Sequence, residues 1–176
     1  MRRVAGQPER GDLYDQRMNR IGRLRQRTLP PHELTQLEDA DSTLVCVIDR
    51  RSSITGPVYE VRWPDGSMVA QARPVEASAR GMVRVTQPDG EIICTAIMSA
   101  VSHRATIATA GKDGKTCACL SWPLMSPGGP AASLDTVDEM RVRIVDPSAD
   151  RLVILACSVI VDELYASGGE LKYSPE

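Results

Sequence analysis

The chain contains no phenylalanine, and its four tyrosines and two tryptophans amount to only 3% aromatic residues. Proteins that bind single-stranded nucleic acids stack the bases on aromatic side chains, and this sequence has little material for such a platform. The net charge is −2, so the chain also lacks the excess of Lys and Arg that nonspecific binding to a phosphate backbone requires. We therefore expect no nucleic-acid partner, and a core filled by aliphatic residues, Met and Cys.

The sequence also lacks an apolar run long enough to span a membrane. The longest, "LVILACSVIV" from Leu152 to Val161, has ten residues, whereas a spanning helix needs about 20. The first residues, "MRRVAGQPER", have no apolar centre of the kind found in secretory signal peptides. The five cysteines are odd in number and lie inside apolar runs, as is typical of reduced, buried thiols. Together these features predict a cytoplasmic protein.

No motif for catalysis or metal binding stands out. Cys117 and Cys119 lie two apart and would share one face of a regular strand, but tetrahedral zinc needs four ligands and no second close pair follows. The Gly128-Gly129 pair lies between prolines and lacks the lysine of a phosphate loop. A nucleophile elbow of the G-x-S-x-G type is absent. We predict no catalytic residues, no metal site and no cofactor, hence a non-enzymatic protein.

Three Asp-Gly pairs recur at a spacing of 24 residues, at Asp65-Gly66, Asp89-Gly90 and Asp113-Gly114. Alternating segments flank them, as in "YEVRWPDGSMVAQARP" and "VRVTQPDGEIICTAIM". Asp-Gly adopts the positive φ angles of tight hairpin turns, so each unit predicts a β-hairpin. From Thr43 onward the pattern therefore predicts an antiparallel meander.

The apolar run near the C-terminus predicts a helix at about residues 150–165, because this segment is too long for a typical strand. Asp146 or Ser148 is a candidate cap for its start. The helix is apolar around most of its circumference, which a protein in water tolerates only if other elements surround it. We therefore predict a mostly β (α+β) protein, an antiparallel barrel of consecutive hairpins that encloses this helix.

The N-terminal segment is basic, since residues 1–30 contain eight arginines and three acidic residues. Apolar residues between Leu13 and Leu24 fall near one helical face, which predicts an amphipathic helix over about 12–27. Such a helix binds anionic membranes or packs on its own domain. The candidate membrane-binding residues are Arg17, Arg20, Arg23 and Arg27, and those of an additional patch are Arg62, Arg73, Arg80 and Arg84.

The hairpin "YEVRWPDGSMVAQARP" and the terminal "RLVILACSVIVDELY" together resemble sequences of the tubby C-terminal-like barrel superfamily, which includes phospholipid scramblases and LURP-one-related proteins. The resemblance implies a barrel over residues 43–166 with a closing helix, preceded by a basic arm and linker (1–42) and followed by a tail (167–176). It implies a lipid- or membrane-associated module without a metal, peripheral at a membrane through the arm. The alternative is a protein-binding or structural scaffold without lipid affinity.

Overall fold

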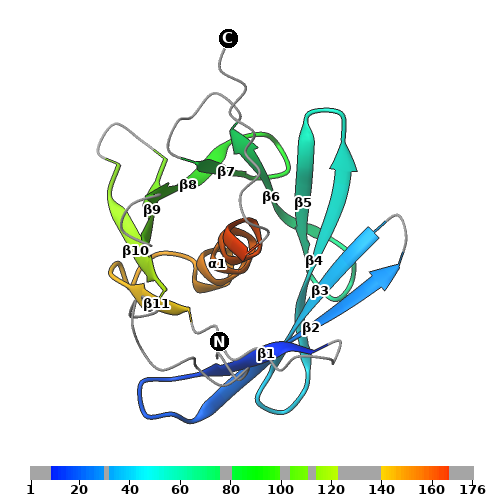
Figure 1. The fold of residues 1–176 in the computed structure, drawn as a ribbon, viewed down its shortest axis with the longest axis vertical. Helices are drawn as coiled ribbons and strands as arrows, with labels where there is room; N and C mark the ends of the chain where they lie inside the picture. The colour runs from blue at the N-terminus through cyan, green and yellow to red at the C-terminus, as the bar shows by residue number, and fades with distance from the viewer. Residues whose placement is uncertain are drawn as a thin grey trace, which may run out of the picture.

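A computed structural model describes residues 9–29, 32–75, 81–99, 104–110, 114–122 and 140–166. Its eleven strands form one antiparallel sheet in which each strand pairs with the next along the chain, and one helix follows. The elements are β1 (Glu9–Tyr14), β2 (Arg20–Leu29), β3 (His32–Asp39), β4 (Leu44–Ser53), β5 (Gly56–Arg62), β6 (Met68–Val75), β7 (Met82–Thr86), β8 (Ile92–Ser99), β9 (Arg104–Thr109), β10 (Thr116–Ser121), β11 (Arg141–Ile144) and α1 (Arg151–Ala166). Figure 1 shows the sheet curving around α1. The predicted mostly β fold with a C-terminal helix is confirmed.

The sheet is open, so the predicted closed barrel is wrong. The strand order runs linearly from β1 to β11, and among the described residues these two edge strands do not pair with each other. A barrel closes only when the registers of the first and last strands match. Here β11 has four residues, and the pairing of β1 is interrupted near Gly11 and Tyr14.

The N-terminal segment forms strands, so the predicted amphipathic helix over 12–27 is also wrong. Arginines alternate with Leu24 and Gln26 between Arg23 and Arg27, which is the two-residue period of a strand. This stretch is in continuous register with β3. A Cβ on Gly22 would lie 2.5 Å from the backbone oxygen of Glu38, so the glycine permits close approach of β2 and β3. The boundary predicted after residue 42 falls in the β3–β4 turn, and β1–β3 continue the sheet.

Helix α1 packs against the concave side of the sheet and supplies much of the core. Seven of its apolar residues are at most 6% exposed, namely Val153, Ile154, Ala156, Cys157, Val159, Ile160 and Val161. The cap of the helix is Asp150, whose Oδ1 accepts hydrogen bonds from the backbone N–H of Leu152 (2.8 Å) and Val153 (3.2 Å). Asp146 instead accepts hydrogen bonds from the backbone N–H and the hydroxyl of Ser148. The predicted caps, Asp146 and Ser148, are therefore wrong, since the cap is Asp150. The tail predicted at 167–176 lies outside the described residues.

Four hairpins share one turn geometry, which joins β1–β2, β3–β4, β5–β6 and β7–β8. In each five-residue turn the first N–H donates to the fifth carbonyl and the fourth N–H donates to the first carbonyl, as in Trp63 to Ser67, with both bonds at 2.9 Å. Only the fourth residue has positive φ, namely Met18 (63°), Ser42 (64°), Gly66 (86°) and Gly90 (91°). This is a type I turn followed by a left-handed bulge residue. The two described Asp-Gly hairpins are confirmed, with the positive φ on glycine alone; Asp113 lies outside the described residues.

The two turns without glycine carry strain that a substitution should release. A non-glycine residue in the left-handed region costs about 1–2 kcal/mol. Substitution by glycine removes this strain, but it also raises the conformational entropy of the unfolded chain, which offsets part of the stabilisation. We expect Met18→Gly to raise the free energy of unfolding by about 0.5 kcal/mol, since Met18 is 75% exposed and contributes little packing. Chemical denaturation measures the change. Gly66→Ala is the matched control, because a Cβ there meets nothing within 4 Å, so only the backbone conformation is affected. We expect Gly66→Ala to lower the free energy of unfolding. No change in either variant would contradict the proposed backbone strain.

Candidate functional site

Charge is distributed unevenly over the sheet. The five strands β1–β5 carry eight arginines and seven acidic residues. The six strands β6–β11 carry five arginines and no acidic residue. The first half of the sheet is therefore nearly compensated by its own side chains, whereas the second half bears a net cationic charge.

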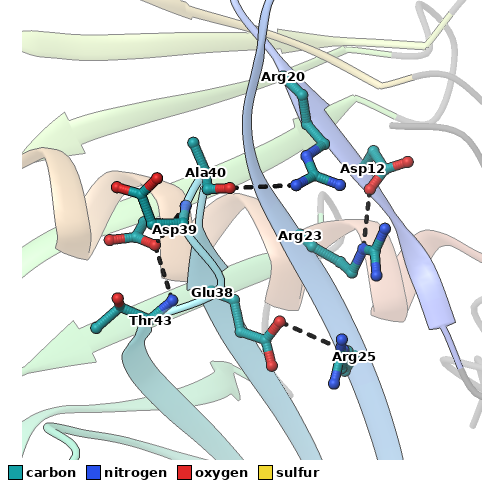
Figure 2. Close-up of polar contacts among 9 residues, drawn as sticks. Asp12, Arg20, Arg23, Arg25, Glu38, Asp39, Ala40 and Thr43 are labelled. Carbon is teal, nitrogen blue, oxygen red and sulfur yellow. Dashed lines mark hydrogen bonds and ion pairs between the residues drawn. The ribbon is translucent and has the colours of Figure 1, made fainter.

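Ion pairs neutralise much of the first half. Arg23 Nε lies 3.1 Å from Asp12 Oδ1, and Arg25 Nε lies 3.3 Å from Glu38 Oε2; Figure 2 shows both contacts. On the neighbouring strands, Glu60 contacts two arginines, with Arg51 at 3.1 Å and Arg62 at 2.7 Å. Glu38 and Glu60 are each 8% exposed, because arginine side chains cover them. This half of the sheet offers few unused charges to a ligand.

The four arginines predicted to bind membrane all lie in the β1–β2 hairpin. Arg17 lies in the β1–β2 turn, and Arg20 opens β2 and donates an Nη hydrogen bond to the carbonyl of Ala40 at 3.1 Å (Figure 2). Arg23 is partly neutralised by Asp12. Arg27 is exposed and lies on the same face as Arg23. Their role in lipid binding stays a prediction.

The arginines of the second half all lie on the convex face. Along β6–β10, alternate residues such as Ala72, Val83, Ala96, Ile107 and Leu120 are buried against α1, so the intervening residues face outward. The outward arginines are exposed, namely Arg73, Arg84, Arg104, Arg141 and Arg143. We call these five residues the arginine face.

The strand register sets the neighbours on this face. Arg73 lies directly opposite Arg84, which in turn lies opposite Thr95. Farther along, Ser121 lies between Arg104 and Arg141 on the flanking strands. Hydroxyl groups thus stand beside guanidinium groups, and all of these side chains donate hydrogen bonds. The chemistry suits an oxyanion.

The sequence indicated only part of this face. Arg73 and Arg84 were candidates, whereas Arg104, Arg141 and Arg143 were not recognised; Arg80 lies outside the described residues. The signal was available, because the segments that read as strands after residue 68 contain a single acidic residue, Glu91, at the start of one of them. Arg62, the remaining candidate, is paired with Glu60.

The concave side holds a charged cluster at the C-terminal end of α1. Arg50 contacts Glu33 on β3 and Glu163 on α1, with its Nε 3.4 Å from Glu163 Oε1. Burial opposes the charge of Arg50, but its hydrogen bond to Glu33 and the fields of ionised Tyr59 and Glu163 outweigh this effect and raise its pKa. The cluster ties the helix to two strands.

Two further contacts hold the helix at its ends. Trp122 Nε1 donates to Asp162 Oδ1 at 2.9 Å. Before the helix, Lys115 Nζ lies 2.7 Å from Asp146 Oδ2. The hydrogen bonds from Lys115 and Ser148 lower the pKa of Asp146 to about 2. These contacts have a structural role, since each joins two segments of the fold.

The cysteines form no metal site among the described residues, where no group of three or more His, Cys, Asp or Glu side chains is suitably placed. Cys117 is buried and Cys119 is exposed, so the two do not share a face. A register shift between Thr116 and Ala118 explains this difference, because a bulge reverses the alternation of side chains. Burial raises the pKa of Cys46 to about 11, and such a thiol is unreactive.

Within the described residues, no helix is both long and apolar enough to cross a membrane. Comparison of the chain with protein-family models, with curated proteins and with solved structures returned no match. The functional argument therefore rests on the geometry and charge of the molecule itself.

Proposed function

We propose that the protein is a non-enzymatic module that associates peripherally with anionic membranes through its arginine face. The observation that carries the proposal is the segregation of charge: six consecutive strands carry five exposed arginines and no acidic residue. A surface of this kind attracts anionic lipid headgroups without any deep pocket.

The charge is sufficient for reversible binding. Each basic residue near an anionic bilayer contributes about 1 kcal/mol, so Arg73, Arg84, Arg104 and Arg143 together give about 4 kcal/mol at low salt. This free energy corresponds to a dissociation constant of about 1 mM. Ile97, which is 39% exposed on the same face, adds apolar contact at the interface. Binding should weaken as salt screens the charges.

The N-terminal hairpin provides a second candidate contact, in place of the predicted helix. Its turn region exposes three large apolar side chains, with Tyr14 at 42%, Met18 at 75% and Ile21 at 51%. Arg17 and Arg20 lie beside them. Apolar side chains with adjacent arginines are typical of segments that rest in a membrane interface.

We further propose a distant relationship to the tubby-like fold of scramblases and LURP-one-related proteins. An antiparallel sheet of consecutive hairpins curved around a C-terminal apolar helix supports this relationship. Fold alone does not fix function, so the lipid role rests on the arginine face.

Flotation of the purified protein with liposomes tests the proposal. We expect flotation with vesicles that contain phosphatidylserine, none with pure phosphatidylcholine, and weaker flotation at high salt. The double variant Arg104→Glu/Arg143→Glu should lose flotation because it reverses two charges on the arginine face. The control variant Arg151→Glu reverses the charge of an exposed residue at the start of α1, outside the arginine face, and should retain flotation. Unchanged flotation of the first variant would overturn the assignment of the face.

The alternative function is a protein-binding or structural scaffold without lipid affinity. The specific observation in its favour is the open sheet, since an edge strand presents backbone groups to which another chain can add a strand. Absence of flotation under every condition would favour this alternative.

A further inference from the structure

We infer that Arg73 and Arg84 form a binding site for a phosphate monoester. The site deepens the proposed function, since phosphatidic acid presents this group at a membrane, but a soluble phosphate ester carries the same chemistry. The inference rests on the placement of two guanidinium groups side by side on β6 and β7.

Arg73 and Arg84 are partners in the pairing of β6 with β7. They are directly opposed in the register, both exposed and both outward-facing. Side chains opposed in this way have Cβ atoms about 5 Å apart, which brings two planar guanidinium groups within reach of one tetrahedral anion. Elsewhere on the face, Arg104 and Arg141 are separated by an intervening strand. Within the described part of the arginine face, Arg73 and Arg84 are the only two arginines that are register partners on adjacent strands.

Neighbouring polar groups orient the pair. Arg73 Nε donates to Gln71 Oε1 at 3.2 Å, which leaves the terminal Nη groups of Arg73 available for a ligand. Thr86 directs its hydroxyl to the backbone carbonyl of Gln71 at 3.4 Å, so it supports the strand pairing. On the other side, Thr95 lies opposite Arg84 and adds a hydroxyl donor. Arg73, Arg84 and Thr95 thus form a row of hydrogen-bond donors across β6, β7 and β8.

Like charges directly opposed across two strands destabilise a sheet. On β1–β5 the chain places carboxylates among its arginines, but among the strands that carry or flank Arg73 and Arg84, three contain none, namely β6, β7 and β8. Of these flanking strands, only β5 contains an acidic residue, Glu60, and it contacts Arg51 and Arg62. A bound anion would compensate the pair.

A dianionic phosphate monoester suits this arrangement better than a singly charged group. It offers three terminal oxygens, and guanidinium groups bind phosphate through two parallel hydrogen bonds each. A phosphodiester with one charge, as in phosphatidylserine, offers fewer oxygens and less charge. Lysine would supply the same charge without the planar pair of donors.

The test uses variants that keep the charge but remove the guanidinium geometry. Arg73→Lys/Arg84→Lys is compared with the matched control Arg104→Lys/Arg143→Lys, by flotation with vesicles that contain phosphatidic acid or phosphatidylserine at equal surface charge. We expect the wild type and the control to prefer phosphatidic acid by about tenfold, the effect of one or two charge-assisted hydrogen bonds. The Arg73/Arg84 variant should lose that preference and still float with phosphatidylserine. A second arm follows the Arg73 Nε–H resonance by NMR during titration with glycerol 3-phosphate.

The outcomes separate this inference from the proposed function. Equal flotation of wild type with both lipids, or equal losses in both lysine variants, would overturn the site and leave general membrane binding standing. No flotation together with a saturable glycerol 3-phosphate response, lost in the Arg73/Arg84 variant, would support the site and overturn the membrane role. Absence of both signals would overturn both.

Discussion

Ile154→Asp is expected to leave no folded protein. Ile154 lies within α1 and is 3% exposed, surrounded by the core that the helix shares with the sheet. Burying a carboxylate without a partner costs several kcal/mol, and the total stability of a domain of this size is about 5–15 kcal/mol. Because every strand curves around the same helix, its loss removes the surface on which the whole sheet packs.

Circular dichroism and limited proteolysis of the variant measure this effect. The control is Arg151→Asp, which places the same residue in the same helix at an exposed position. An acidic residue in the first turn interacts favourably with the helix dipole, so this control should melt close to the wild type. A cooperative, wild-type-like transition for Ile154→Asp would show that α1 does not form the core of the sheet.

Arg50→Met is expected to destabilise the fold by about 2 kcal/mol. The arginine links β3 and α1 through Glu33 and Glu163, and the Glu163 side chain is only 11% exposed. Removing one member of a fully buried ion pair costs roughly 3–5 kcal/mol because the other charge is left behind. The Arg50 side chain is 35% exposed, so solvent screening lowers the expected loss below that range. Methionine preserves most of the packing of the aliphatic part.

A double-mutant cycle separates the ion pair from other effects of the substitution. Glu163→Gln removes the charge that contacts Arg50, so Arg50→Met/Glu163→Gln should be more stable than the sum of the single variants predicts. Urea denaturation of the four proteins gives the interaction free energy. Strict additivity would show that the link between Arg50 and α1 contributes nothing to stability.

The N-terminal segment shows why sequence patterns failed there. Leu13, Met18, Ile21 and Leu24 satisfy a helical spacing, while Arg23 to Arg27 satisfy the alternation of a strand. The pairing of β2 with β3 decides between these two patterns, and Gly22 permits the close approach. A single sequence does not state which distant segment will pair with it, so the helix prediction lacked the deciding contact.

The candidate site shows the same division. The sequence displays the number of arginines, and its strand-like segments after residue 68 contain a single acidic residue, Glu91. It does not display which guanidinium is neutralised, because Arg25 meets Glu38 and Arg62 meets Glu60 only through the folded backbone. Cys117 and Cys119 likewise separate to opposite faces through a bulge that their spacing does not reveal.

By itself the sequence determined the strands from β4 to β11, the glycine turns between two pairs of them, and the apolar helix that fills the core. These features depend on residue spacing within one element or one hairpin, where local sterics and side-chain periodicity act. Only the tertiary structure decided the strands β1–β3, the open edges of the sheet and the placement of Arg73 opposite Arg84. Those depend on register between strands, which fixes each charge opposite a partner or leaves it facing solvent.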